Sequence, residues 1–359
     1  MRLGFFIQPV HPPSRSNAEV LREDREAVVL ADKLGYREAF IGEHLADSAE
    51  PITSSLTFIA SLADSCPSIT FGTGVLPLPN YHPLMAAAQI AMVDHITNGR
   101  LLLGVGPGVA PDAKALGDES DRRQKLAEAI EQILAIWGGT APYDIEGQFH
   151  RISTSDSLDP ELGIGEVMRP LQQPHPPIVL TSMRADSTGP AAAGRRGWQG
   201  ISATYVGDYI VRAHIQEYRR GRVSAGLSDD AAGWRVARSL FVSNDEKTAR
   251  AYAITCKGAH GFYFHVMRSK LARFGAHHLM GNTPDTAEKE LSLERILENQ
   301  VIAGTPEQVA SQILSFRQRV GPFGTLLYTG HDWVDPDLAR SSMELMQTEV
   351  WPRVLAGLN

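Results

Sequence analysis

Apolar residues in this chain fall into two alternating patterns: short continuous runs, and longer segments in which they recur at helical spacing. The run over residues 2–8 predicts a buried strand, and residues 17–34 predict a helix, because Val20, Val28 and Leu34 recur at helical spacing. We expect strands over residues 2–8, 36–42, 68–75, 101–106, 178–181, 200–203, 236–242 and 325–329. We expect helices over residues 17–34, 53–64, 83–96, 120–137, 185–196, 207–220, 245–274, 287–297, 305–320 and 335–355.

Strands that alternate with helices favour a parallel sheet in an α/β fold over a sheet built from hairpins. Eight such strands predict a (β/α)8 TIM barrel. A doubly wound open sheet is the alternative, but residues 8–16, the first strand-to-helix turn, contain no glycine and therefore lack the dinucleotide fingerprint. We expect one barrel domain over residues 1–359, with insertions around residues 138–177 and 258–300.

Composition narrows the functional classes. The chain has 359 residues, of which 43% are hydrophobic and 21% charged, and its net charge of -7 argues against nucleic acid as the main partner. No apolar run approaches the length of a membrane span, and the run over residues 3–7 is too short for a signal peptide, so we expect no membrane association and a cytoplasmic location. Cys66 and Cys256 form no CxxC pattern, so neither a disulfide framework nor a thiolate metal site is indicated.

The twelve histidines raise the question of a metal site. His260 and His265 are spaced so that they do not share a helical face, and His277 and His278 are adjacent without an acidic residue at ligand spacing. We therefore expect no metal site, and interpret these histidines as packed or solvated side chains.

Residues 71–83 join the third expected strand to the next helix through an unusual loop. Gly72 and Gly74 remove side chains at the strand end, while Pro77 and Pro79 stop the strand from continuing. A sharp turn would by itself explain these residues. The alternative is that something flat or bulky lies against the exposed backbone.

Residues 186–190 begin a helix that follows a late strand. Ser187 and Thr188 precede Pro190, and free backbone N–H groups at a helix start can bind phosphate, with Arg184 adding charge. An ordinary N-cap is the commoner use of such residues. The position favours a ligand, because barrel enzymes often bind phosphate near their last strands.

Five motifs in chain order together resemble the bacterial luciferase-like flavin monooxygenases, and more closely their limonene monooxygenase and diketocamphane monooxygenase branch. They lie at residues 43–44, 72–77 with 82–83, 99–108, 304–307 and 323–333. The resemblance extends over nearly the whole chain.

The resemblance implies that reduced FMN binds at the mouth of the barrel. The flavin ring would lie on Thr73, Gly74 and Val75, with a non-prolyl cis peptide between Gly74 and Val75. The remaining expected contacts of the cofactor, including those of its phosphate, are Gly106, Thr181, Ser187, Thr188 and Gly189. One departure concerns Pro107, which stands where luciferases proper have an arginine near the phosphate.

The resemblance also implies that the flavin reacts with O2 to give a C4a-peroxyflavin in a water-poor pocket. His44 is the expected acid–base group, and Glu43 is expected to act with it, at least by orienting it. A purely structural histidine is the alternative. Phe6, Leu76 and Trp198 are the expected apolar lining of the substrate pocket.

We therefore expect an FMN-dependent monooxygenase that oxygenates a small hydrophobic substrate such as a cyclic ketone, terpene or aldehyde. Two alternatives share the fold: an F420-dependent oxidoreductase, and a flavoprotein that binds FMN without turnover. A separate flavin reductase is expected as a partner, because the sequence has no nicotinamide fingerprint. A homodimer is expected from the resemblance alone.

Overall fold

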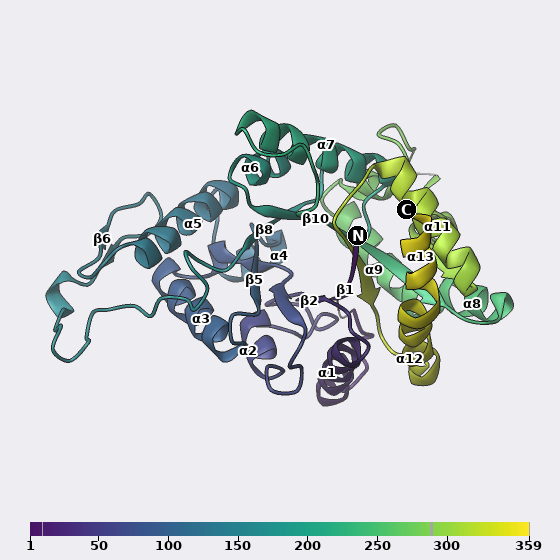
Figure 1. Ribbon diagram of the computed structural model, residues 1–359, viewed down its shortest axis with the longest axis horizontal. Coiled ribbons are helices and arrows are strands. Elements are labelled where there is room, and N and C mark those ends of the chain that lie inside the picture. Colours follow the sequence, from purple (N-terminus) through teal and green to yellow (C-terminus); the bar gives the residue numbers. More distant parts are fainter. Residues whose placement is uncertain (9, 288–289, 359) are drawn as a thin grey trace.

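The computed structural model describes residues 1–8, 10–287 and 290–358. Eight parallel strands close into a ring, because β10 pairs with β9 on one side and with β12 on the other, and β12 pairs with β1. Helices surround this ring (Figure 1). The strands of the ring are β1 (Arg2–Ile7), β2 (Glu38–Ile41), β3 (Thr70–Thr73), β5 (Leu101–Gly106), β8 (Ile178–Ser182), β9 (Gln199–Ser202), β10 (Trp234–Val242) and β12 (Thr325–Gly330). The predicted TIM barrel is confirmed.

Apart from α4 (Ala110–Ala115), which was not predicted, the helices follow the strands as predicted, with some changes of boundary. They are α1 (Asn17–Lys33), α2 (Ser55–Ala60), α3 (Pro83–Ile96), α4 (Ala110–Ala115), α5 (Arg122–Gly138), α6 (Gly189–Arg195), α7 (Asp208–Ser224), α8 (Glu246–Ala253), α9 (Ala259–Ala272), α10 (Leu293–Gln300), α11 (Pro306–Val320), α12 (Pro336–Leu345) and α13 (Trp351–Gly357). The single helix expected over residues 245–274 is wrong, because the chain leaves the helical path between α8 and α9, around Gly258. No helix within the described residues combines the length and apolarity that crossing a bilayer requires.

Two further strands of the barrel sheet were not predicted. β4 (Leu76–Pro77) pairs with the end of β5, and β11 (Val301–Gly304) pairs with the carboxyl-terminal half of β10. β11 follows α10 directly, without a turn residue between them, so its short apolar run is not separated from the helical pattern in the sequence.

Seven strands each contribute one side chain to an apolar cluster in the interior of the barrel. These residues are Phe6, Phe40, Leu102, Val179, Ile201, Ala237 and Leu327. β3 contributes Gly72 next to Phe40, and a Cβ at Gly72 would lie 2.6 Å from the Phe40 ring. The barrel is therefore a packed core, with space for a ligand only at its ends.

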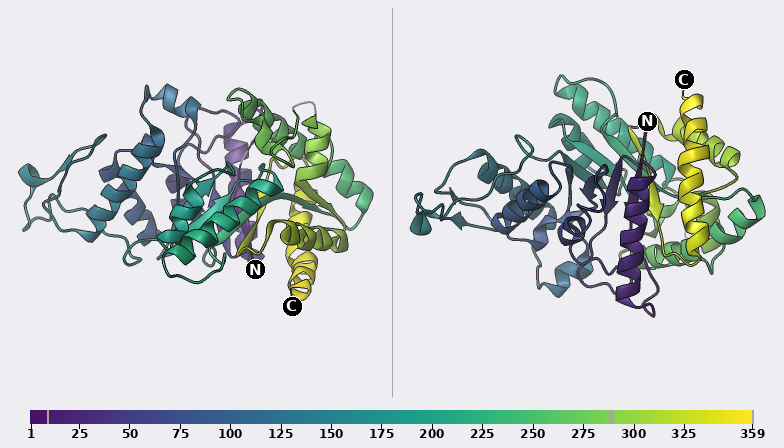
Figure 2. Two further views of the ribbon diagram at one scale, coloured as in Figure 1. Left: turned by 90° about the horizontal axis from the view of Figure 1, so that it is seen from above. Right: turned by 60° about the horizontal axis from the view of Figure 1, so that its bottom comes forward.

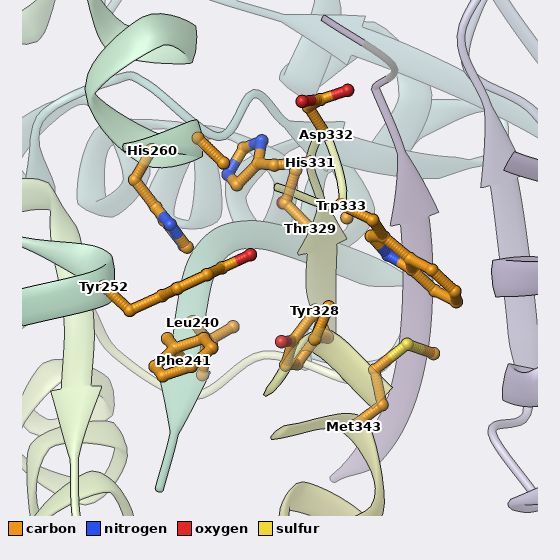
Figure 3. Close-up of a pocket in the computed structure, with 13 residues that line it drawn as sticks. Leu240, Phe241, Tyr252, His260, Tyr328, Thr329, His331, Asp332, Trp333 and Met343 are labelled. Carbon is orange, nitrogen blue, oxygen red and sulfur yellow. The ribbon is translucent and has the colours of Figure 1, made fainter. Parts of the chain in front are cut away.

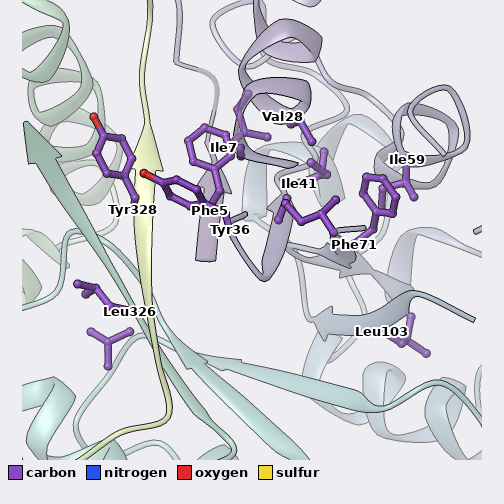
Figure 4. Close-up of a cluster of buried hydrophobic side chains, with 14 of the residues drawn as sticks. Phe5, Ile7, Val28, Tyr36, Ile41, Ile59, Phe71, Leu103, Leu326 and Tyr328 are labelled. Atoms are coloured by element: carbon purple, nitrogen blue, oxygen red, sulfur yellow. The ribbon is translucent and has the colours of Figure 1, made fainter. Parts of the chain in front are cut away.

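A larger core lies between the strands and the surrounding helices (Figure 4). Three aromatic side chains meet there, with ring centroids 6.2 Å apart for Phe5 and Tyr36 and 6.1 Å apart for Phe5 and Tyr328. Phe5 faces these helices while its neighbour Phe6 faces the barrel interior, as the alternation of side chains along a strand requires.

The segments expected as insertions form two excursions. Residues 138–177 contain the antiparallel pair β6 (Asp144–Ile145) and β7 (Ile152–Ser153), and extend away from the barrel (Figures 1 and 2). Residues 258–300 contain α9, the 3₁₀ turn η3 (His277–Met280) and α10. Side chains of this second excursion pack with Val10 and Ala49, so it covers the loops that follow β1 and β2.

Candidate active site

A cavity of about 350 Å³ opens at the carboxyl ends of the barrel strands. Residues that follow β1, β2, β3, β5, β8 and β9 all contribute to its wall, which places it where barrel enzymes have their active sites. Its volume is in the range of small-molecule and cofactor sites. The expected site residues that line it are Phe6, Glu43, His44, Gly74, Val75, Gly106, Thr181, Ser187, Thr188 and Gly189.

The backbone at the end of β3 forms a flat ledge on this cavity. The peptide bond between Gly74 and Val75 is cis, as the family resemblance implies. Gly74 N donates a 2.6 Å hydrogen bond to Ile41 O, which ties the ledge to β2. A Cβ at Gly74 would lie 2.8 Å from the Phe6 ring, so a side chain at this position would require the Phe6 ring to move.

Three expected site residues do not line the cavity. Thr73 is buried, and its hydroxyl donates a 2.6 Å hydrogen bond to Gly104 O, so the side chain joins β3 to β5 and does not line the cavity. Leu76 is fully buried in the core between strands and helices. Trp198 precedes β9 and therefore lies at the opposite end of the barrel, with the Arg196 guanidinium 4.7 Å from its ring centroid.

The apolar wall is built instead by residues that the sequence did not single out. Val105, Leu126, Leu180, Ile201 and Tyr205 line the cavity, together with the predicted Phe6. These residues lie in or after expected strands and helices, so the sequence indicated that they are near the barrel. A strand that is buried on both faces is apolar throughout, so the pattern does not show which of its side chains face the cavity.

His44 is held by a carboxylate from its own loop. Its Nε2 lies 3.2 Å from Glu50 Oε1, and the side chain of Glu50 is almost completely buried. Burial opposes the protonation of His44, but the charge of Glu50 and the contact with it prevail, so the pKa of His44 is raised above its ordinary value. For Glu50, burial is likewise outweighed, by His44 and Lys270, which lower the pKa of Glu50 to about 2.

Glu43 does not orient His44, contrary to the sequence-based expectation. Its carboxylate accepts hydrogen bonds from Ser55 N at 2.8 Å, Ser55 Oγ at 2.6 Å and the Tyr81 hydroxyl at 2.6 Å. Burial raises the pKa of Glu43 in spite of these bonds. The partner of the His44 side chain is Glu50, seven positions away from Glu43 along the same loop.

Polar groups gather at the other side of the cavity, around the start of α6. Arg123 and Arg184 line it with Ser187 and Thr188, while the buried Ser182 Oγ has no hydrogen-bond partner. α6 begins at Gly189 rather than at residue 185, and the Thr188 hydroxyl does not cap it. The ordinary N-cap role is therefore not realised at Thr188.

Position 107 is a proline, so its side chain supplies no charge to the cavity. Pro107 O instead accepts a 2.6 Å hydrogen bond from Arg122 Nε, and Arg122 also pairs with Asp118 at 3.2 Å. The cations that face the cavity are Arg123 and Arg184.

Comparison with known proteins assigns the family. The family model described as luciferase-like monooxygenase matches residues 1–322 of this chain. The chain belongs to the luciferase-like monooxygenases. It is therefore an enzyme of that family, and the resemblance inferred from the motifs is confirmed.

Relatives of this luciferase-like monooxygenase include the limonene 1,2-monooxygenase of Rhodococcus erythropolis, which is 27% identical over 97% of this chain and 85% of the relative. Among solved structures, the oxygenating constituent of 3,6-diketocamphane monooxygenase from Pseudomonas putida, a type II Baeyer-Villiger monooxygenase in complex with FMN, is 25% identical with a TM-score of 0.87, over 99% of this chain and 98% of that chain. The coenzyme F420-dependent tetrahydromethanopterin reductase of Methanopyrus kandleri is 19% identical with a TM-score of 0.70, over 99% of this chain and 100% of that chain, and shows a shared fold alone.

This luciferase-like monooxygenase also has a much smaller pocket of about 20 Å³, enough room for one water molecule (Figure 3). His260 and His331 face each other there, with ring centroids 4.7 Å apart. Burial lowers the pKa of His260 to about 4 and that of His331 well below its ordinary value, so both rings are neutral. The tertiary structure thus pairs two histidines that are far apart in the sequence.

In the described part of this luciferase-like monooxygenase, one group of three side chains could hold a metal ion: His11, Glu23 and Asp332, with ligand atoms within 4.8 Å of one another. His11 is already engaged on both ring nitrogens, by Asp332 at 2.6 Å and by Asp24 at 3.1 Å. Burial alone would lower the pKa of His11, but the two carboxylates raise it to about 9. The ring is therefore a charged member of an ion cluster, whereas a metal ligand must be neutral.

Proposed function

We propose that this protein binds reduced FMN in the cavity at the barrel mouth and uses O2 to oxygenate a small hydrophobic substrate, such as a cyclic ketone, terpene or aldehyde. The observation that supports this most is the open backbone ledge at Gly74 and Val75, on the wall of a cavity large enough for a cofactor. The FMN complex of the diketocamphane relative supports the same choice of cofactor.

The residues present fit this cofactor. Gly74 lines the cavity with backbone alone, which suits a flat ring. At the other side, the unpartnered Ser182 hydroxyl and the cations of Arg123 and Arg184 suit a phosphate. We propose that these groups supply the charge that Pro107 does not.

Bound reduced FMN would supply the electrons that activate O2 for insertion into the substrate. The protein's own contribution begins with its walls, because Phe6, Val105, Leu180 and Ile201 exclude water from the reacting groups. His44 contributes a titratable group at the same cavity. Since its Nε2 is engaged by Glu50, Nδ1 is the atom at which it can release or accept a proton.

We further propose that a separate reductase supplies the reduced flavin. The first strand-to-helix turn lacks the glycine fingerprint for a nicotinamide cofactor, and the diketocamphane relative is itself described as an oxygenating constituent. The protein would then be the oxygenase component of a two-component system.

A homodimer is also proposed, on the basis of α3. Met85, Met92 and Ile96 on this helix are 57%, 48% and 46% exposed, and such apolar side chains gathered on one helix suit contact with a second copy. Light scattering of the purified protein, alone and as a Met85→Lys/Met92→Lys variant, tests this, with a change from dimer to monomer as the expected result.

The central experiment measures oxygenated product and hydrogen peroxide while an unrelated reductase supplies reduced FMN. With a panel of cyclic ketones, terpenes and aldehydes, we expect oxygenated product only when the protein is present, since free reduced flavin yields peroxide alone. Reduction of a test substrate by reduced F420, with no product from reduced FMN and O2, would favour the F420-dependent oxidoreductase. Flavin binding with no product from either cofactor would favour a non-catalytic flavoprotein.

A further inference from the structure

Glu50 is a buried carboxylate with two cationic or titratable partners on different elements. One of its oxygens lies 3.2 Å from His44 Nε2, and the other pairs with Lys270 Nζ. The Glu50 side chain is 2% exposed, so its charge depends on these partners for stability. Glu50 is therefore not one of the solvated charges at the protein surface.

Lys270 belongs to α9, in the excursion over residues 258–300, and also pairs with Asp47. On the other side of the same loop, Asp112 of α4 accepts hydrogen bonds from Leu45 N at 3.2 Å and Ala46 N at 3.1 Å. The loop that presents His44 is thus fixed from two sides by elements distant in the sequence.

We propose that Glu50 is a positioning residue of the active site, which holds the His44 imidazole by Nε2 and is itself fixed by Lys270. Fixing Nε2 selects the orientation of the ring and leaves Nδ1 as the nitrogen that exchanges a proton. The excursion that carries Lys270 then contributes to catalysis without lining the cavity, since Lys270 does not form part of its wall. The catalytic meaning of this arrangement rests on the proposed function, whereas the hold on His44 does not.

Four charged or titratable groups act on His44. Glu50 and Asp112 favour its protonated form, and Lys270 disfavours it. The fourth group is Glu43, whose charge also interacts with that of His44. Asp47 provides a matched control, because it also pairs with Lys270, whereas the carboxylate that pairs with His44 is that of Glu50. Replacing either Glu50 or Asp47 by its amide removes one negative charge beside the same lysine.

The test measures the titration of His44 by NMR of histidine-labelled, flavin-free protein, with the signal assigned by a His44→Gln variant. In Glu50→Gln, we expect the pKa of His44 to fall by roughly 1–2 units, the usual effect of losing an opposite charge at this distance. In Asp47→Asn, we expect it to stay close to its original value. No fall in Glu50→Gln, or an equal fall in both variants, would overturn the proposal.

Glu50→Asp keeps the charge and shortens the side chain, so it tests the same point if the amide variant does not fold. Its His44 pKa should lie below that of the unaltered protein, and an unchanged value would count against positioning by Glu50. The pH profile of product yield provides a second readout, whose His44-dependent limb should shift to lower pH in Glu50→Gln. A shifted titration with an unchanged yield profile would leave the hold on His44 intact and contradict the catalytic role of His44.

Discussion

Arg235 and Glu38 form a bidentate ion pair between β10 and β2, with Nε to Oε1 at 2.6 Å and Nη2 to Oε2 at 2.9 Å. Their side chains are 2% and 3% exposed. Breaking such a pair leaves one buried charge uncompensated. We expect Glu38→Gln to lower the free energy of unfolding by about 3–5 kcal/mol, measured by urea denaturation.

The double variant Glu38→Met/Arg235→Met tests whether the loss of stability comes from the single charge that is left unpaired. Because both charges are removed, its loss of stability should be smaller than that of Glu38→Gln. If the single variant is as stable as the unaltered protein, the pair does not hold the two strands together.

The ledge at the end of β3 makes a prediction about Gly74. In Gly74→Ala, the new methyl group would lie 2.8 Å from the Phe6 ring and would stand beside the proposed flavin site. Overpacking of this kind costs about 1–3 kcal/mol of free energy. Because the Phe6 ring that must move also lines the cavity, we expect FMN affinity to fall by roughly 10-fold or more. Quenching of FMN fluorescence measures this, and Gly138→Ala is the control, because its added Cβ meets nothing within 4 Å.

His44 is predicted to act in chemistry rather than in cofactor binding. His44→Ala should lower the oxygenated product per reduced flavin by about 100-fold, a typical loss for a general acid or base, and increase the yield of peroxide. The dissociation constant of FMN should change little. An unaltered yield would remove His44 from the catalytic residues.

Arg184 is predicted to recognise the phosphate of the cofactor. Riboflavin lacks this group, so Arg184→Met should weaken binding of FMN by roughly 10-fold and leave binding of riboflavin almost unchanged. Arg219→Met is the matched control, because Arg219 pairs with Asp229 as Arg184 pairs with Asp186, but does not line the cavity. Equal losses for both flavins would contradict the phosphate contact.

The ion cluster around His11 predicts a dependence of stability on pH. The folded protein raises the pKa of His11 from 6.5 to about 9, so its proton is held more tightly in the folded state. This contribution is complete below pH 6.5 and is lost as pH rises through 9. The unfolding free energy should therefore decline between these values, and the decline should be smaller in His11→Gln. A pH dependence that is identical in both proteins would show that another group is responsible.

The sequence alone predicted the eight strands of the ring, because strands of a closed parallel barrel are buried on both faces and appear as continuous apolar runs. It also indicated the ledge, since Gly74 and Pro77 at a strand end change the backbone locally. The same reasoning missed β11, whose apolar residues follow a helix without punctuation, and extended one helix through Gly258.

The sequence predicted part of the site, and a physical reason separates the residues that were placed correctly from the one that was not. His44 and Gly74 follow strands, Thr181 lies near the end of β8, and closure of the barrel brings the carboxyl ends of all strands to one face. Trp198 was misplaced because it precedes a strand, so the same closure puts it at the opposite end. The sequence thus determined which end of each strand would form the site.

Only the tertiary structure decided which charges act on His44. Glu43 is adjacent to His44 in the chain, yet Ser55 and Tyr81 occupy its carboxylate, while Glu50 contacts the imidazole. Lys270 reaches Glu50 from a helix more than half the chain away. Electrostatic and hydrogen-bonding contacts act over a few ångströms in space, and no local pattern of residue types records which distant side chains folding brings within that range.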